Sequence, residues 1–444
     1  MKKTPEIDII ILAKSNYIRG VSMNNYTILN ANIKRKIVSY TTKICKNDET
    51  LPKTKFVNDM IFGLIKSQST HISKISRTLK ETTHLNQTIS RLDKSLDKYE
   101  LTNNYDNYLN ELKCEVDDDT IFCVDNSDMI KPHGYHFESM GYVKDGSSKN
   151  NNIEKGYHLA EIVMLGKNKQ PRSVYSHIYS ETQSGFISSN DETFKSLDKS
   201  IATFGNKGIY TFDRGYDADK YIEYGVKKDI NFIIRSKKNR KCIHKNKKKS
   251  VDNVILDYKG RIVMTLSFQD KVHTVSVSHT KIKPLCVDES LNLVVIHGFN
   301  NEVFKLISNM EIKSKEDVKK IVCAYFSRWR IEEYFKFKKQ QFGFEDIRVR
   351  SLNKLRNLNT LLTISIGFIS ILSSEIKDNI LVMAIKDYAH GLKQKVKFWL
   401  YRIADGLSVL LSLSNKGIRD LITPKKQEQD YNLFSLYGIN LDTC

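Results

Sequence analysis

The spacing of apolar residues changes near residue 117, and this change constrains the fold more than any other feature of the sequence. Before it, as in KFVNDMIFGLIK, apolar residues recur every three to four positions, which predicts amphipathic helices. After it come short apolar runs such as TIFCVD and GIYTFD, and helical segments follow them. Strands followed by helices are typical of an α/β domain. We therefore expect a helical N-terminal part and then an α/β core.

The expected domain boundaries follow from these changes of period. Residues 1–112 are expected to form a helical DNA-binding domain and residues 113–235 the first part of the core. Residues 236–312 contain short alternating runs such as RIVMTLSF and LNLVVIHG, which predict a β-rich insertion. Helical periodicity returns in residues 313–350, where the core resumes, and continues through a helical C-terminal region and tail, residues 351–444.

The charge of the chain favours a polyanionic partner. Lys and Arg number 71 against 51 Asp and Glu, a formal net charge of +20. Such an excess suits nucleic acid first and an acidic membrane surface second, although a lysine-rich proteome would give the same composition. In residues 235–249, nine of 15 residues are Lys or Arg and none is acidic. This run is either a solvated hairpin loop or a surface that follows a phosphate backbone.

Short turns between the N-terminal helices suit a helix-turn-helix arrangement. Their polar faces offer a set of candidate DNA contacts: Lys74, Arg77, Gln87, Arg91 and Lys94. A small helical bundle with solvated cations would show the same pattern, so the sequence leaves both interpretations open.

Cysteine and hydropathy patterns limit the class of protein. The seven cysteines are scattered and none forms a CxxC pair, which indicates reduced thiols in the cytoplasm and no zinc ribbon. The longest apolar stretch, residues 361–372, is 12 residues long. A membrane span needs roughly 20 residues. We therefore expect a buried helix here and no membrane partner.

Two aspartates follow apolar strands in the expected core, Asp125 after IFCV and Asp213 after IYTF. Ligands bind at the carboxyl ends of strands in α/β sheets, although a single Asp there could simply begin a turn. A third acid, Glu332, lies on a helical segment. Three converging carboxylates would repel by roughly 4 kcal/mol per pair at 4 Å and a dielectric constant near 20. Such a site would need bound cations, and with two Mg²⁺ ions it could carry out phosphoryl transfer.

The helical segment is YFSRWRIEEYFKFKK, residues 325–339, and it gathers unlike functional groups on one face. At about 100° per residue, four of them share a sector roughly 60° wide: Tyr325, Arg328, Glu332 and Lys339. Glu333 lies outside this sector. An ion-paired helix face could arise by chance, but ion pairing would not require a tyrosine.

The spacing Y-x2-R-x3-E-x6-K of these four residues resembles the YREK signature of DDE transposases of the insertion-sequence-four family. The neighbours Trp329, Ile331 and Glu333 are similar to the family's context around that signature. DRGYD, residues 213–217, resembles the block with the second aspartate, and VDNSDMIKPHG, residues 124–134, is similar to the first-aspartate block. The resemblance is close over about residues 117 to 350.

The resemblance implies an RNase H-like catalytic core with a β-rich insertion before the glutamate. It implies that Asp125, Asp213 and Glu332 are the catalytic residues and bind two Mg²⁺ ions, which Mn²⁺ can replace. It further implies that Tyr325, Arg328 and Lys339 grip the transposon end, and it makes Arg214 a DNA contact. Asp128 is an alternative first ligand, but Asp125 is favoured because it directly follows the strand IFCV.

The function that this resemblance implies is that of a transposase of a DNA insertion element. It would cleave and join element ends with activated water and then a 3′-hydroxyl as nucleophiles. The implied partners are double-stranded DNA, as element terminal inverted repeats and target DNA, and a second copy of the chain in a synaptic complex. The implied location is the bacterial cytoplasm, at the nucleoid.

Two other functions remain open from the sequence, a non-transposing RNase H-like nuclease or inactive relic, and a DNA-binding regulator without catalysis. The cleavage route is open too, because relatives that cut through a DNA hairpin can stack a flipped base on an insertion-domain tryptophan. Between residues 213 and 332 the sole tryptophan is Trp329, for which we expect core packing. Another aromatic residue or a histidine could do the stacking.

Overall fold

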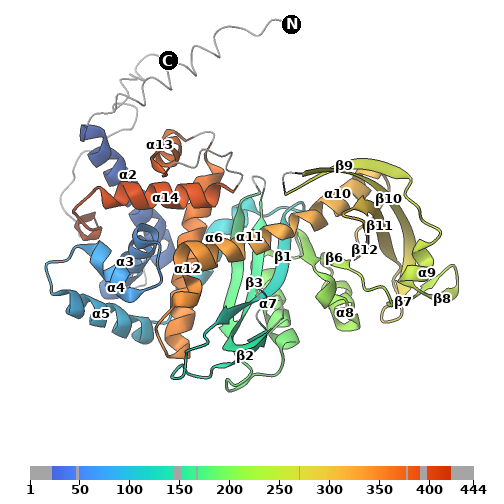
Figure 1. Ribbon diagram of the computed structural model, residues 1–444, viewed down its shortest axis with the longest axis horizontal. Helices are drawn as coiled ribbons and strands as arrows, with labels where there is room; N and C mark the ends of the chain where they lie inside the picture. Colours follow the sequence, from blue (N-terminus) through green and yellow to red (C-terminus); the bar gives the residue numbers. More distant parts are fainter. Residues whose placement is uncertain are drawn as a thin grey trace, which may run out of the picture.

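The computed structural model describes residues 23–46, 50–144, 146, 152–166, 169–269, 271–376, 379–390 and 398–421. Residues 1–22 of the expected N-terminal domain and the expected tail from Pro424 lie outside the described residues. The described chain forms a mixed α/β structure in which helices flank one large sheet (Figure 1).

The sheet contains twelve strands, ten of them in the order β2-β3-β1-β5-β6-β12-β11-β10-β7-β8, while β4 pairs with β3 and β9 with β10. Strand β1 is buried between β3 and β5, which is why its residues Phe122 to Val124 form a continuous apolar run. Strand β5 pairs in parallel with both β1 and β6. The first six strands are Ile121–Ile130, Gly141–Lys144, Ile153–Leu165, Pro171–Tyr179, Ile209–Phe212 and Asn231–Arg235.

Strands β7 to β12 occupy the range in which a β-rich insertion is predicted. Because β12 pairs with β6, they extend the core sheet instead of forming a separate one. They are Lys241–His244, Lys247–Ser250, Ile262–Phe268, Lys271–Pro284, Leu291–Phe299 and Glu302–Ser308, with helix α9 at Val251–Ile255.

The N-terminal helices pack against helices from the other end of the chain, and together they form one helical body beside the sheet (Figure 1). Helix α3 contacts both α12 and α14. The helices of this body are α2 Met23–Cys45, α3 Leu51–Ser67, α4 Ile72–Leu79, α5 Leu85–Lys98, α6 Thr102–Leu112, α12 Leu352–Ser374, α13 Ile380–Tyr388 and α14 Trp399–Ser412.

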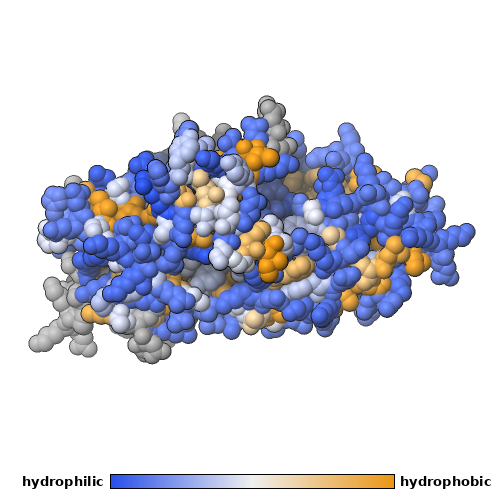
Figure 2. Space-filling view, turned by 90° about the horizontal axis from the view of Figure 1, so that it is seen from below, coloured by the Kyte–Doolittle hydropathy of each residue, from blue (hydrophilic) through white to orange (hydrophobic). Residues whose placement is uncertain are grey.

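Helix α12 contains the stretch for which a buried helix is expected, residues 361–372. Among the described residues it is the one helix long and apolar enough to cross a membrane, and 83% of its most apolar window is buried inside the protein. It packs on β4, where the Ser370 hydroxyl donates to the carbonyl of Pro171 at 2.8 Å. The lower face of the molecule is mainly hydrophilic, with small hydrophobic areas (Figure 2).

Helices α7 Ser189–Phe204 and α8 Asp219–Lys227 accompany the core strands, and α10 Lys315–Ser327 and α11 Trp329–Lys336 carry the signature segment. The continuous α-helix assumed for residues 325–339 was wrong in two places. The α-helical hydrogen bonding is interrupted by a single turn residue, Arg328, between α10 and α11, although Arg328 keeps helical φ and ψ, and residues Phe337–Gln341 form a π-helix. Short 3-10 turns lie at Lys113–Glu115, Arg214–Tyr216, Phe344–Asp346 and Arg419–Leu421.

Candidate active site

The parallel pairing of β1 and β5 brings Asp125 and Asp213 to the same edge. Val124 is in register with Phe212, and each aspartate is the next residue along its strand. Asp213 directly follows β5, and its side chain accepts a hydrogen bond from the backbone N–H of Gly215 at 2.7 Å. Asp125 does not end its strand as expected, because β1 continues along β3 to Ile130. The pairing of β1 with β5 ends at Val124, one residue before Asp125, so Asp125 still lies where the parallel pair opens at the sheet edge.

Arg328 links two of the three predicted carboxylates. Its Nη1 lies 3.0 Å from Oδ2 of Asp125, and its Nη2 lies 2.7 Å from Oε1 of Glu332. The turn between α10 and α11 places this guanidinium over the end of the β1–β5 pair, with 15% of its side chain exposed. Glu332 is more open, at 48%. The structure thus brings Asp125, Arg328 and Glu332 into direct contact.

The electrostatics show that Asp213 belongs to the same group. The pKa of Asp125 is raised to about 7, mainly by burial; the Arg328 guanidinium acts to lower it, and the charges of Asp213 and Glu332 act to raise it. Burial lowers the pKa of Arg328, but the surrounding acids and Tyr325 outweigh it, so that its pKa lies above its usual value. Three carboxylates therefore act on one another around a single guanidinium.

Tyr325 is 5% exposed and lies beneath the site. Its ring packs edge-on against Phe304 and Phe326, and burial raises its pKa. In the predicted row, Arg328 and Glu332 contact each other across one helical turn, whereas Tyr325 is buried instead of lying on an open face.

Lys339 lies on the π-helix in a separate ion-paired cluster. Its Nζ is 2.6 Å from Oδ1 of Asp128 and 3.0 Å from Oε1 of Glu345. Asp128 thus has a lysine as its partner, which supports Asp125 as the aspartate of the carboxylate group. Glu333, the neighbour of Glu332, forms an ion pair with Lys336 at 3.0 Å and does not join that group.

Two further residues lie beside the site. Arg214 is exposed on the short turn after Asp213, and it has no ion-pair partner within the described ranges. Trp329 is half-buried, with its ring centroid 6.0 Å from that of Phe268 on β9 and the Arg330 guanidinium 4.6 Å away. The core packing expected for Trp329 is therefore packing against the β9–β10 hairpin.

The carboxylates have suitable chemistry for a divalent cation, because Mg²⁺ prefers oxygen ligands. As they stand, no three Asp, Glu, His or Cys side chains in the described part of the chain converge closely enough to hold a metal ion. The reason is visible in the geometry, since Arg328 already supplies a positive charge between Asp125 and Glu332. The donor set fits a metal ion that takes the place of this guanidinium.

Asp217 is a residue of the site that the sequence did not reveal, although it stands in the DRGYD block. Its side chain is fully buried and accepts hydrogen bonds from the Ser236 hydroxyl at 3.2 Å, the Lys237 backbone N–H at 2.5 Å and Arg240 Nε. The loop that carries Asp213 is thereby tied to the chain that leaves β6.

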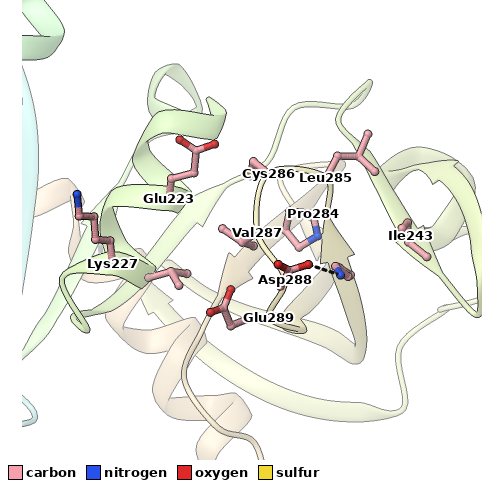
Figure 3. Close-up of a pocket in the computed structure, with 11 residues that line it drawn as sticks. Glu223, Lys227, Ile243, Pro284, Leu285, Cys286, Val287, Asp288 and Glu289 are labelled. Atoms are coloured by element: carbon pink, nitrogen blue, oxygen red, sulfur yellow. Dashed lines mark hydrogen bonds and ion pairs between the residues drawn. The ribbon is translucent and has the colours of Figure 1, made fainter.

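A cavity of about 540 Å³ lies elsewhere, between α8, β7 and the loop that joins β10 to β11 (Figure 3). Glu223 and Lys227 of α8 face it from one side, and Asp288, which pairs with Lys283 at 2.8 Å, from the other. None of the predicted site residues lines it.

Comparison with known proteins gives a family match and a set of similar solved structures. Residues 185–368 match the transposase DDE domain. The matched range includes Asp213, Arg328 and Glu332 and covers less than half of the 444 residues. It begins after strand β4, so it does not include β1. Asp125 lies before it.

Among solved structures, the chain is similar to a piggyBac transposase in a cryo-EM structure of its synaptic complex with hairpin DNA. The two sequences are 10% identical, the TM-score is 0.44, and the alignment covers 92% of this chain and 81% of the other. No curated protein matches the chain.

Proposed function

We propose that this protein is a transposase of a DNA insertion element, which cleaves and joins element ends by metal-dependent phosphoryl transfer. The observation that carries the proposal is the group of Asp125, Asp213 and Glu332 around Arg328 in a chain whose residues 185–368 match the transposase DDE domain. An RNase H-like core and membership of the insertion-sequence-four family are part of the proposal. The parallel β1–β5–β6 strands and the Y-x2-R-x3-E-x6-K spacing support them.

The three carboxylates would hold two Mg²⁺ ions, which Mn²⁺ can replace. Bound there, such ions activate an oxygen nucleophile and stabilise charge on the reacting phosphate. The chain supports this arrangement by fixing Asp125 within the β1–β3 ladder and by orienting Asp213 through the N–H of Gly215. Glu332, on the first turn of α11, has the freedom of a half-exposed side chain.

The proposed DNA contacts differ in whether their side chains are already available to a phosphate or are held in ion pairs. Arg214 is exposed beside Asp213 and can meet a phosphate as it stands. Lys339 would first have to leave Asp128 and Glu345, and Arg328 would have to leave at least one carboxylate. Tyr325 would support Arg328 from below, because its ring is buried.

The N-terminal helices are proposed to recognise element ends, with target DNA and a second copy of the chain completing the synaptic complex. Four of the predicted contacts are exposed: Lys74, Arg77, Gln87 and Lys94. Arg91 serves the interior of the helical body instead, because it pairs with Asp59 at 3.0 Å and Glu81 at 2.6 Å. The proposed location is the bacterial cytoplasm, at the nucleoid.

Excision from a reporter plasmid that carries the element and its native flanks tests the proposal. Glu332→Gln and Asp213→Asn should abolish excision and retain DNA binding, because each removes a carboxylate charge from the group. Glu333→Gln is the matched control on the same helix and should excise normally. Excision that survives Glu332→Gln would remove this glutamate from the chemistry. A protein that binds DNA but never excises would be a regulator or a relic.

A further inference from the structure

The lysine-rich run is a regular β-hairpin that the carboxylate site leaves unused. Strands β7 and β8 pair from Lys241 and Ser250 to His244 and Lys247. Lys245 and Asn246 form the two-residue turn, with φ of 49° and 60°. Two positive φ values in succession match the twist of the flanking strands. The position of each lysine is therefore set by the strands, which settles the shape of the run but not its partner.

Six lysines of this segment are exposed: Lys237, Lys238, Lys241, Lys245, Lys247 and Lys248. We call them the basic hairpin surface. In the part of the chain that the structure describes, none of them forms an ion pair, whereas Arg235 pairs with Glu302 and Arg240 with Asp217 and Asp219. Like charges on neighbouring strands repel one another. A surface of this kind is stabilised by a partner that brings many negative charges.

The root of the hairpin stands beside the carboxylate site. Ile234 of β6 is in register with Phe212 of β5, so Arg235 is the neighbour of Asp213 across the two strands. Asp217 then fixes the chain that follows, through its bonds to Ser236, Lys237 and Arg240. The positive charges run outward from the edge at which β5 ends before Asp213.

The direction of this surface is away from the helical body. Strands β7 and β8 lie at the opposite end of the molecule from α2 to α5, with the carboxylate-bearing strands between them (Figure 1). DNA that extends from the N-terminal helices to the basic hairpin surface would pass along the strands that carry the carboxylates.

We infer that the basic hairpin surface binds the phosphate backbone of duplex DNA that continues past the carboxylate site. This inference rests on the proposed function and names a further part of its DNA-binding surface. A strand of four residues is about 13 Å long. A duplex carries one charge per roughly 1.7 Å, so that length holds about eight phosphate charges. The surface has enough length and charge to meet several of them without reading sequence.

The experiment measures the salt dependence of binding to a labelled duplex that contains the element end and its flank. Lys247→Gln/Lys248→Gln removes two charges from the surface. Each phosphate contact contributes roughly 0.9 to the slope of log K against log salt. The slope should therefore become shallower by about 1.8, and hydroxyl-radical protection of the flank should be lost while protection of the end remains.

Lys169→Gln/Lys207→Gln is the matched control, because it also removes two exposed lysines. Lys169 lies in the turn between β3 and β4, and Lys207 lies between α7 and β5, at the end of β5 opposite to Asp213. It should leave the slope and the footprint unchanged. An unaltered slope in the hairpin variant, or an equal change in both variants, would overturn the inference. The excision experiment is independent of this one, since loss of excision in Glu332→Gln with an unaltered hairpin slope would reject the surface and keep the transposase.

Discussion

Replacing Arg328 by glutamine tests whether this side chain is the resident counter-ion of the three carboxylates. Its guanidinium lies 3.0 Å from Asp125 and 2.7 Å from Glu332. Unit charges 4 Å apart attract by about 4 kcal/mol at a dielectric constant near 20 and about 1 kcal/mol in water. The pair with Glu332, 48% exposed, is near the lower value, and the pair with Asp125, 23% exposed, lies between the two. Losing both removes on the order of 2–4 kcal/mol of attraction.

Arg328→Gln should bind Mn²⁺ more tightly than the unaltered protein in the absence of DNA, because the competing cation is gone. A recovery of about 2 kcal/mol corresponds to roughly a 30-fold lower Kd. Electron paramagnetic resonance of free Mn²⁺ during a titration gives this Kd directly. The variant should also unfold at a lower temperature in a chelator, and Mn²⁺ should raise that temperature by more than it does for the unaltered protein.

Lys336→Gln is the control, since it removes a positive charge from the same helix at a residue that pairs with Glu333. It should leave Mn²⁺ binding unchanged. The reasoning is refuted if Arg328→Gln binds Mn²⁺ no more tightly than the unaltered protein, or if both variants gain equally.

Two further predictions concern stability. Lys338→Met should cost about 3–5 kcal/mol in a urea titration, because Glu161 would lose a partner 3.0 Å away in a pair that is almost fully buried; adding Glu161→Gln should restore much of it, and an equal loss in the double variant would contradict this. Without metal, the raised pKa of Asp125, about 7 against an unfolded value near 3.9, gives stability that is present below pH 4 and lost as pH rises through 7. Asp125→Asn should remove that part of the pH dependence, and an unchanged profile would show that another group causes it.

Local patterns in the sequence were sufficient to place Asp125 and Asp213. Both follow apolar runs, and parallel pairing of the runs brings the two residues together. The pairing partners of Asp128 and Lys339 were beyond reach, because 211 residues separate them and no local pattern records such a contact. The same holds for Asp217, whose partners become visible only when β6 lies beside β5.

The helical wheel of residues 325–339 was adequate for Arg328 and Glu332, which pair four residues apart, but not for the residues after Lys336. It assumes a constant 100° per residue, and the chain departs from that value in the π-helix at Phe337–Gln341. Lys338 and Lys339 both lie in this π-helix, where Lys338 pairs with the buried Glu161 and Lys339 with Asp128. Propensity does not record this departure, since packing of the π-helix against α14 and the turn at Phe344–Asp346 accompanies it.

The helical body has a consequence for the order in which the chain can fold during synthesis. Asn30 donates to the carbonyl of Leu410 at 2.7 Å, and Ser408 donates to that of Lys66 at 2.7 Å. These contacts of the N-terminal helices can form only after residues some 340 to 380 positions later have been synthesised. At 5–20 residues per second, that delay is roughly 20 to 70 seconds. A ribosome-bound chain can pack α3 against α2 and α4, but the part of α3 that contacts α12 and α14 stays uncovered until the last helices arrive.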